Sequence, residues 1–83
     1  MWLEFNRIKD CPGTTLTTNV DGDMVTETLI NSIDDITIAN RITNWKTKLV
    51  IETIFLAGDK AQTAVFNLVE TPIGYIQKEV RLR

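Results

Sequence analysis

The sequence predicts a mainly β protein of the α+β class, a small antiparallel sheet or half-barrel of about five strands with one C-terminal helix. Two apolar runs flank the polar tip Gly58-Asp59-Lys60 within residues 46–70, which is the pattern of a β-hairpin. Short segments rich in Thr, Val and Ile precede this hairpin, separated by turn residues such as Asp21-Gly22. The pair Thr71-Pro72 then introduces apolar residues at helical spacing, which predicts a helix over about residues 72–82.

The first third of the chain predicts two strands and a loop. Trp2–Ile8 reads as an opening strand with alternating side chains, and Lys9–Gly13 as a loop because Pro-Gly is a strong turn signal. Thr14–Val20 is rich in threonine, which suits an exposed or edge strand. The following dipeptide, Asp21-Gly22, predicts a turn.

Residues 23–40 carry two competing patterns. Residue type favours strands near Val25–Ile30 and Asp35–Thr43, with a turn around Ser32-Ile33-Asp34. The spacing of Leu29, Ile33 and Ile36 also fits a short helix. We adopt the two strands as the expectation.

The hairpin predicted within residues 46–70 is apolar on both faces. With Ala57 opposite Ala61, Phe55 faces Thr63, and Phe55 and Phe66 become core residues on opposite faces. One face carries Glu52 among six apolar residues: Val50, Ile54, Leu56, Ala64, Phe66 and Leu68. A hairpin of this kind must be covered on both faces, either by two parts of this chain or by a second chain.

The C-terminal helix rests on a capping pair. Thr71 can accept orphan backbone N–H groups, and Pro72 suits the first helical position. Ile73, Ile76 and Val80 then share one helical face, so the helix could cover one face of the hairpin. A terminal strand is the alternative, because Ile76, Val80 and Leu82 share parity.

Composition limits the class of protein. Eighty-three residues allow one domain, so we expect a single domain over residues 1–83, and a net charge of −2 makes nucleic acid an unlikely partner. Cys11 is the only cysteine, which excludes an internal disulfide and suits an intracellular setting. No apolar run approaches the roughly 20 residues of a membrane span, and the start lacks the features of a signal peptide. We therefore expect a cytoplasmic protein that does not bind membranes.

The residue inventory argues against catalysis. The chain has no histidine, which removes the usual nucleophile activation and most zinc and iron sites. Cys11 has no base near it in the sequence, and Asp21-Gly22-Asp23 fails the spacing of an EF-hand loop. We expect no enzyme, no catalytic residue, no bound metal and no cofactor.

The best candidate for a ligand site is the segment from Arg41 to Lys48. Trp45 could stack a base or ring, while Arg41, Lys46 and Lys48 could neutralise phosphates, as in a site for a nucleotide-like ligand. The alternative is a plain connection, with Trp45 in the core and the lysines solvated at an edge.

The apolar hairpin also predicts an interface between copies. The expected contact residues lie on the face opposite the C-terminal helix: Val50, Ile54, Leu56, Phe66 and Leu68. Left in water, they would form a larger apolar patch than soluble monomers usually tolerate. We therefore expect a homo-oligomer, either a dimer or a larger assembly.

Four stretches resemble short FlbD-like proteins of flagellar operons and phages: Leu3–Ile8, Ile30–Ile36, Thr53–Gly58 and Val69–Ile73. The resemblance implies an opening strand, an aspartate-isoleucine turn, a hairpin with glycine at its tip and a Glu-Thr-Pro start to a C-terminal helix. It also implies a small non-enzymatic protein that acts through contacts. We expect a binding module that self-associates or, alternatively, a phage-type anti-defence inhibitor that sequesters a nucleotide signal or blocks a host protein.

Overall fold

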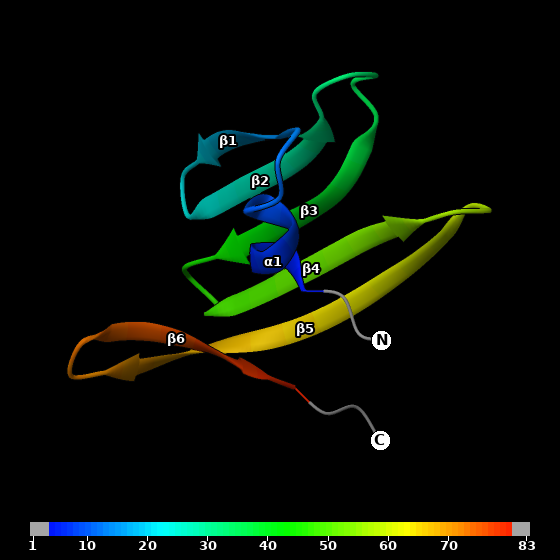
Figure 1. The fold of residues 1–83 in the computed structure, drawn as a ribbon. Helices are drawn as coiled ribbons and strands as arrows, with labels where there is room; N and C mark the ends of the chain where they lie inside the picture. The colour runs from blue at the N-terminus through cyan, green and yellow to red at the C-terminus, as the bar shows by residue number, and fades with distance from the viewer. Residues whose placement is uncertain (1–3, 81–83) are drawn as a thin grey trace.

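Six strands, paired in chain order, form one open antiparallel sheet in the computed structural model, which describes residues 4–80 (Figure 1). A short N-terminal helix lies across one face of this sheet. The prediction of a mainly β, antiparallel protein is confirmed, with six strands in place of about five and the helix at the other end of the chain. The elements are α1 (Phe5–Lys9), β1 (Thr14–Asp21), β2 (Met24–Asn31), β3 (Thr37–Asn44), β4 (Leu49–Leu56), β5 (Lys60–Thr71) and β6 (Gly74–Glu79).

The N-terminal segment is helical, so the predicted strand Trp2–Ile8 is wrong over its described part. Phe5 and Ile8 are three residues apart, which places both side chains on one face of α1 and against the sheet. The strand prediction divided these side chains between two sides by parity, but so short a segment contains too few side chains to separate the strand period from the helix period. Trp2 and Leu3 lie outside the described residues.

The strands predicted at Thr14–Val20, Val25–Ile30 and Asp35–Thr43 are confirmed, as β1, β2 and β3. Gly22 and Asp23 form the β1–β2 loop, where Gly22 has a positive φ of 58° that favours glycine. The predicted turn at Ser32-Ile33-Asp34 also forms, and two side chains accept backbone N–H groups there. Asn31, just before the turn, accepts from Ile33, and Asp34, its last residue, accepts from Ile36.

The central hairpin forms as β4 and β5, with a register two residues from the predicted one. Phe55 faces Ala61 instead of Thr63, because the loop spans Ala57–Asp59. Gly58 and Asp59 take positive φ angles of 74° and 59° in this loop. A shift of two preserves parity, so the predicted division of side chains between the two faces still holds.

The C-terminal helix predicted at about residues 72–82 is wrong over its described part. Thr71 pairs with Gly74 across a two-residue turn, and β6 continues the sheet. The Thr71 hydroxyl donates to the Gly74 carbonyl at 2.6 Å in place of capping a helix. Pro fits the second position of a type I turn as well as the first position of a helix, and Gly fits the fourth. Residues 81–83 lie outside the described residues.

The core lies between α1 and the middle of the sheet. Phe5, Leu29, Ala39 and Ile54 form a buried cluster, with Ile8 and Ile38 packed at its margin. In Figure 1, α1 lies in front of β3 and β4, and no other described element packs on the sheet. Within the described chain, α1 therefore covers the middle of one face of the sheet, and the opposite face is left open.

Candidate functional site

Arg41 joins two glutamates on the face of the sheet that α1 covers. Glu27, Arg41 and Glu52 lie directly opposite one another on β2, β3 and β4. Arg41 donates from Nε and Nη2 to the two carboxylate oxygens of Glu27, at 2.8 and 3.0 Å, and from Nη1 to Glu52 Oε2 at 3.5 Å. Strand register alone brings these three charges together.

The Arg41 guanidinium also connects α1 and β6 to the centre of the sheet. Its central carbon lies 4.5 Å from the centroid of the Phe5 ring, and Nη1 donates to Asn6 Oδ1 at 3.0 Å. Gln77 accepts from Arg41 Nη1 at 3.4 Å and donates to Glu52 Oε2 at 2.9 Å. These contacts give Arg41 a structural role beneath the helix.

The charge of Arg41 is already matched. Burial alone would lower the pKa of Arg41, but the hydrogen bond and charge of Glu27, with those of Glu52, outweigh burial and raise the pKa. The prediction that Arg41 lines an anionic site beside Trp45 is therefore wrong. The reason is that two carboxylates on neighbouring strands face Arg41, and neither is near it in the sequence.

Trp45, Lys48 and Tyr75 form a second group, which we call the ring-lysine cluster. The Trp45 and Tyr75 rings meet edge to face, with centroids 5.4 Å apart and an angle of 72° between planes. Lys48 Nζ lies 5.4 Å from the Trp45 centroid and 5.2 Å from the Tyr75 centroid, so it makes cation–π contacts with both rings. Trp45 is exposed at the surface and does not enter the core.

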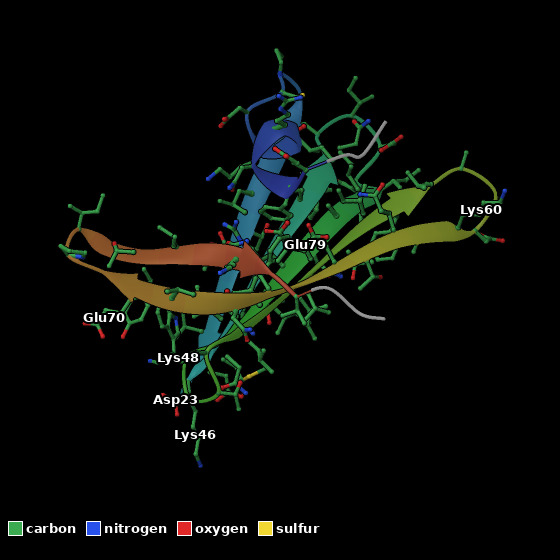
Figure 2. The ribbon with its side chains drawn as sticks, turned by 90° about the horizontal axis from the view of Figure 1, so that it is seen from below. Asp23, Lys46, Lys48, Lys60, Glu70 and Glu79 are labelled. Carbon is green, nitrogen blue, oxygen red and sulfur yellow. The ribbon has the colours of Figure 1, made fainter. Side chains whose placement is uncertain are left out.

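The β3–β4 loop holds this cluster in place. Asn44 Oδ1 accepts from the backbone N–H groups of Lys46 and Thr47, which fixes the turn. The backbone N–H of Trp45 donates to the Asp23 carbonyl, and the backbone carbonyl of Lys48 accepts from the N–H of Leu68. Lys46 is exposed, and Figure 2 shows Lys46 and Lys48 at the end of the sheet that carries Asp23. Of the four predicted ligand residues, Trp45 and Lys48 contact each other, while Lys46 lies on the same loop.

The uncovered side of the sheet, called the open face below, carries apolar side chains from five strands. Ile42, Ile51 and Val65 form a row across β3, β4 and β5 because they are direct partners in the strand register. The large apolar side chains of this face, by alternation along each strand, are Met24, Ile30, Ile42, Leu49, Ile51, Phe55, Val65, Val69 and Ile76. Six of these side chains are exposed, and Ile30, Ile42 and Val65 are half-buried between their neighbours.

The predicted interface residues lie on the opposite, helix-covered face. Val50 and Ile54 are 1% and 3% exposed within the monomer, so neither is available to a second copy. Phe66 and Leu68 are half-buried, and Leu56 is exposed near the end of β4. The interface prediction therefore chose the wrong face, because the covering helix comes from the N-terminus and packs on the side assigned to the partner. Phe55, predicted as core, lies on the open face, 44% exposed.

A cavity of about 240 Å³ lies beside α1, between the helix and β6. Its lining includes three glutamates, Glu4, Glu52 and Glu79, together with the rings of Phe5 and Phe66. Glu52 already accepts from Gln77 and Arg41. Of the polar side chains on the cavity wall, Asn6, Glu52 and Gln77 thus belong to the Arg41 network, whereas Glu4 pairs with Arg7.

The remaining chemistry of the described chain is sparse. Cys11 is exposed, with its Sγ directed to the Arg7 carbonyl at 3.4 Å. Within residues 4–80, no three His, Cys, Asp or Glu side chains gather as metal ligands would. The helix in the same range, α1, has five residues and is not long and apolar enough to cross a membrane.

Comparison with models of known protein families, with curated proteins and with solved structures finds no match. The candidate surfaces therefore stand on geometry alone. Sequence reasoning missed Tyr75, which it placed in a helix, and the open-face residues Leu49, Ile51, Val69 and Ile76. The alternation of side chains along the hairpin could have identified these four. Leu49, Ile51 and Val69 are odd-numbered residues of β4 and β5 on one face, and Ile76 pairs with Val69.

Proposed function

We propose that this protein is a non-enzymatic interaction module that self-associates through the open face of its sheet. The observation that carries the proposal is the row Ile42–Ile51–Val65, flanked on β4 by Leu49 and Phe55, with no described element covering it. Extended apolar patches on soluble proteins mark sites of interaction.

A second copy is the simplest cover for this face. Two copies related by a two-fold axis present the same surface to each other, so one set of residues serves both sides. Stacked sheets pack about 10 Å apart with interdigitated side chains, an arrangement that would bury the open-face residues. The buried apolar core of the described chain is small, with six members: Phe5, Leu29, Ala39, Val50, Ile54 and Ala64. Association would add stability that a domain of this size needs.

Replacing Ile51 by Glu is the direct test of the open face. Ile51 lies at the centre of the row, so burying a carboxylate there should raise the dissociation constant at least tenfold, equivalent to about 1.4 kcal/mol. Size-exclusion chromatography with light scattering should show a shift to a smaller species, and the melting temperature should fall.

The matched control is Ile33→Glu. Ile33 is 93% exposed in the β2–β3 loop, so the same chemical change there should leave mass and melting temperature unchanged. An assembly that responds equally to both variants, or to neither, would contradict a role for the open face.

The ring-lysine cluster favours a second candidate function, which is binding of a nucleotide-like ligand. Two exposed rings with a cation beside them can stack a base and attract a phosphate. Under this candidate function, the protein would be a phage-type anti-defence inhibitor that sequesters a nucleotide signal. An inhibitor that blocks a host protein is the other version of this proposal. The resemblance to FlbD-like proteins also stays a prediction, although the C-terminal helix that it implies is replaced by β6.

Trp45→Ala and Lys48→Ala test the ligand candidate. Each should weaken binding of a nucleotide at least tenfold in titration calorimetry against a nucleotide panel. The melting temperature should fall by only a few degrees, since an edge-to-face pair contributes about 0.5–1.5 kcal/mol. Lys60→Ala is the charge control, because Lys60 lies at the other end of the β4–β5 hairpin (Figure 2). Equal loss with Lys60→Ala, or no heat with any nucleotide, would exclude the cluster as this site.

A further inference from the structure

The outer edge of β1 carries no lysine, proline or bulge that would oppose strand pairing. β1 forms one margin of the sheet and pairs only with β2, over all eight residues from Thr14 to Asp21. Its sequence contains no proline and no charge before Asp21, and its pairing with β2 has no bulge. Natural edge strands usually carry lysine, proline or a bulge for this purpose. The other margin, β6, is shorter and carries Lys78 and Glu79.

The β1–β2 turn determines which backbone groups of β1 face outward. In a two-residue hairpin, the residues flanking the loop exchange both backbone hydrogen bonds, and bonded and non-bonded pairs then alternate. Asp21 and Met24 flank the loop, so Leu16, Thr18 and Val20 fall in non-bonded pairs and direct their N–H and C=O groups away from β2. The other end of the β1–β2 hairpin shows the same alternation. Asn31 lies opposite Thr14, and its N–H donates to the Ile36 carbonyl and so points away from β1.

We propose that β1 pairs antiparallel with β1 of a second copy, across a two-fold axis at Thr18. This register places Leu16 of each copy opposite Val20 of the other. Both side chains are exposed in the monomer, and both project from the helix-covered face. Thr18 meets its own copy, and Thr17 faces Asn19 of the other copy. Pairs of β-branched, aliphatic and hydroxyl side chains are the favourable cross-strand combinations.

Self-complementarity selects this partner and this register. Moving the axis to Thr17 would place Leu16 opposite Thr18 and leave the aliphatic side chains unmatched. With the axis at Thr18, Asp21 lies opposite Thr15 of the other copy, so no like charges meet within the paired strands. Pairing at β1 would extend the sheet continuously from one copy into the other. It uses a surface separate from the open face and does not depend on the proposed function.

Amide hydrogen exchange on the unaltered protein tests the edge directly. At a concentration where the chain is associated, the amides of Leu16, Thr18 and Val20 should exchange at least tenfold more slowly than at high dilution. Unchanged exchange of these three amides in an associated sample would overturn the proposal.

Thr18→Lys gives the second test, since it places two cations at the axis and should raise the dissociation constant at least tenfold. Thr47→Lys, in the exposed β3–β4 loop, is the matched control. Thr18→Pro removes one outward N–H and is a second way to weaken pairing at β1. Far-ultraviolet circular dichroism checks that both Thr18 variants are folded. Equal masses for folded Thr18→Lys and Thr47→Lys would overturn the proposal.

The two surfaces are separable in the Ile51→Glu background. Ile51→Glu alone should leave a dimer held by β1, and adding Thr18→Lys should yield a monomer of 9.4 kDa. A monomer with Ile51→Glu alone overturns pairing at β1 and leaves the open face standing. Dissociation by Thr18→Lys alone, with no effect of Ile51→Glu, removes the open face and leaves pairing at β1.

Discussion

Replacing Phe5 by Ala is expected to lower the free energy of unfolding by about 3–5 kcal/mol, the usual cost of removing a fully buried phenylalanine. Phe5 is 0% exposed and is the one buried residue of α1. A helix of five residues has no stability of its own, so its position depends on what it buries. Losing the ring also removes the contact beneath the Arg41 guanidinium.

Urea denaturation followed by circular dichroism measures this change. Ile33→Ala is the control, because Ile33 is 93% exposed in the β2–β3 loop and is not part of the open-face set. It should cost clearly less than Phe5→Ala in the same denaturation experiment. A loss for Phe5→Ala no larger than that for Ile33→Ala would mean that α1 contributes little to the core and that the sheet is stable without it.

The second large effect is expected for Arg41→Met. Glu27 and Glu52 retain side-chain exposures of only 17% and 9%, so both carboxylates would stay largely buried without a partner cation. Breaking such a pair by removing one member typically costs about 3–5 kcal/mol. The free energy of unfolding at neutral pH should fall by that order.

The control for Arg41→Met removes the other two charges as well. In the triple variant Arg41→Met, Glu27→Gln, Glu52→Gln, no charged group of this row remains buried, so much of the lost stability should return. A triple variant as unstable as Arg41→Met would show that the arginine acts through packing on Phe5 and not through charge.

Strand positions could be predicted from the sequence because residue type and turn chemistry act locally. Gly22 and Gly58 mark loops, and the β-branched and aromatic residues between them form the strands. The division of β4 and β5 into two faces also survived, since a register error of two residues leaves every side chain on its side.

The ends of the chain could not be predicted, because their signals are ambiguous between local structures. Thr71-Pro72 satisfies the start of a helix and the start of a turn equally, and pairing with β5 decides for the turn. Phe5 and Ile8 share a face in a helix but not in a strand; two apolar residues are too few to decide between the two periods, and burial of both against the sheet decides for α1. These two errors together exchanged the covered and open faces.

The candidate sites were predictable only where they are local. Trp45 and Lys48 share one loop, so the sequence brought them together. Tyr75 joins them from β6, and Glu27 and Glu52 reach Arg41 from neighbouring strands. Contacts of this kind depend on strand register, which the local pattern of residue types does not specify by itself.

Sedimentation equilibrium of the unaltered protein tests the central claim, self-association through the open face, most directly. Over low to high micromolar concentration, the account predicts a mass above 9.4 kDa that rises with concentration and is lowered by Ile51→Glu. A single species of 9.4 kDa up to high micromolar concentration, or a larger mass that Ile51→Glu leaves unchanged, would contradict it.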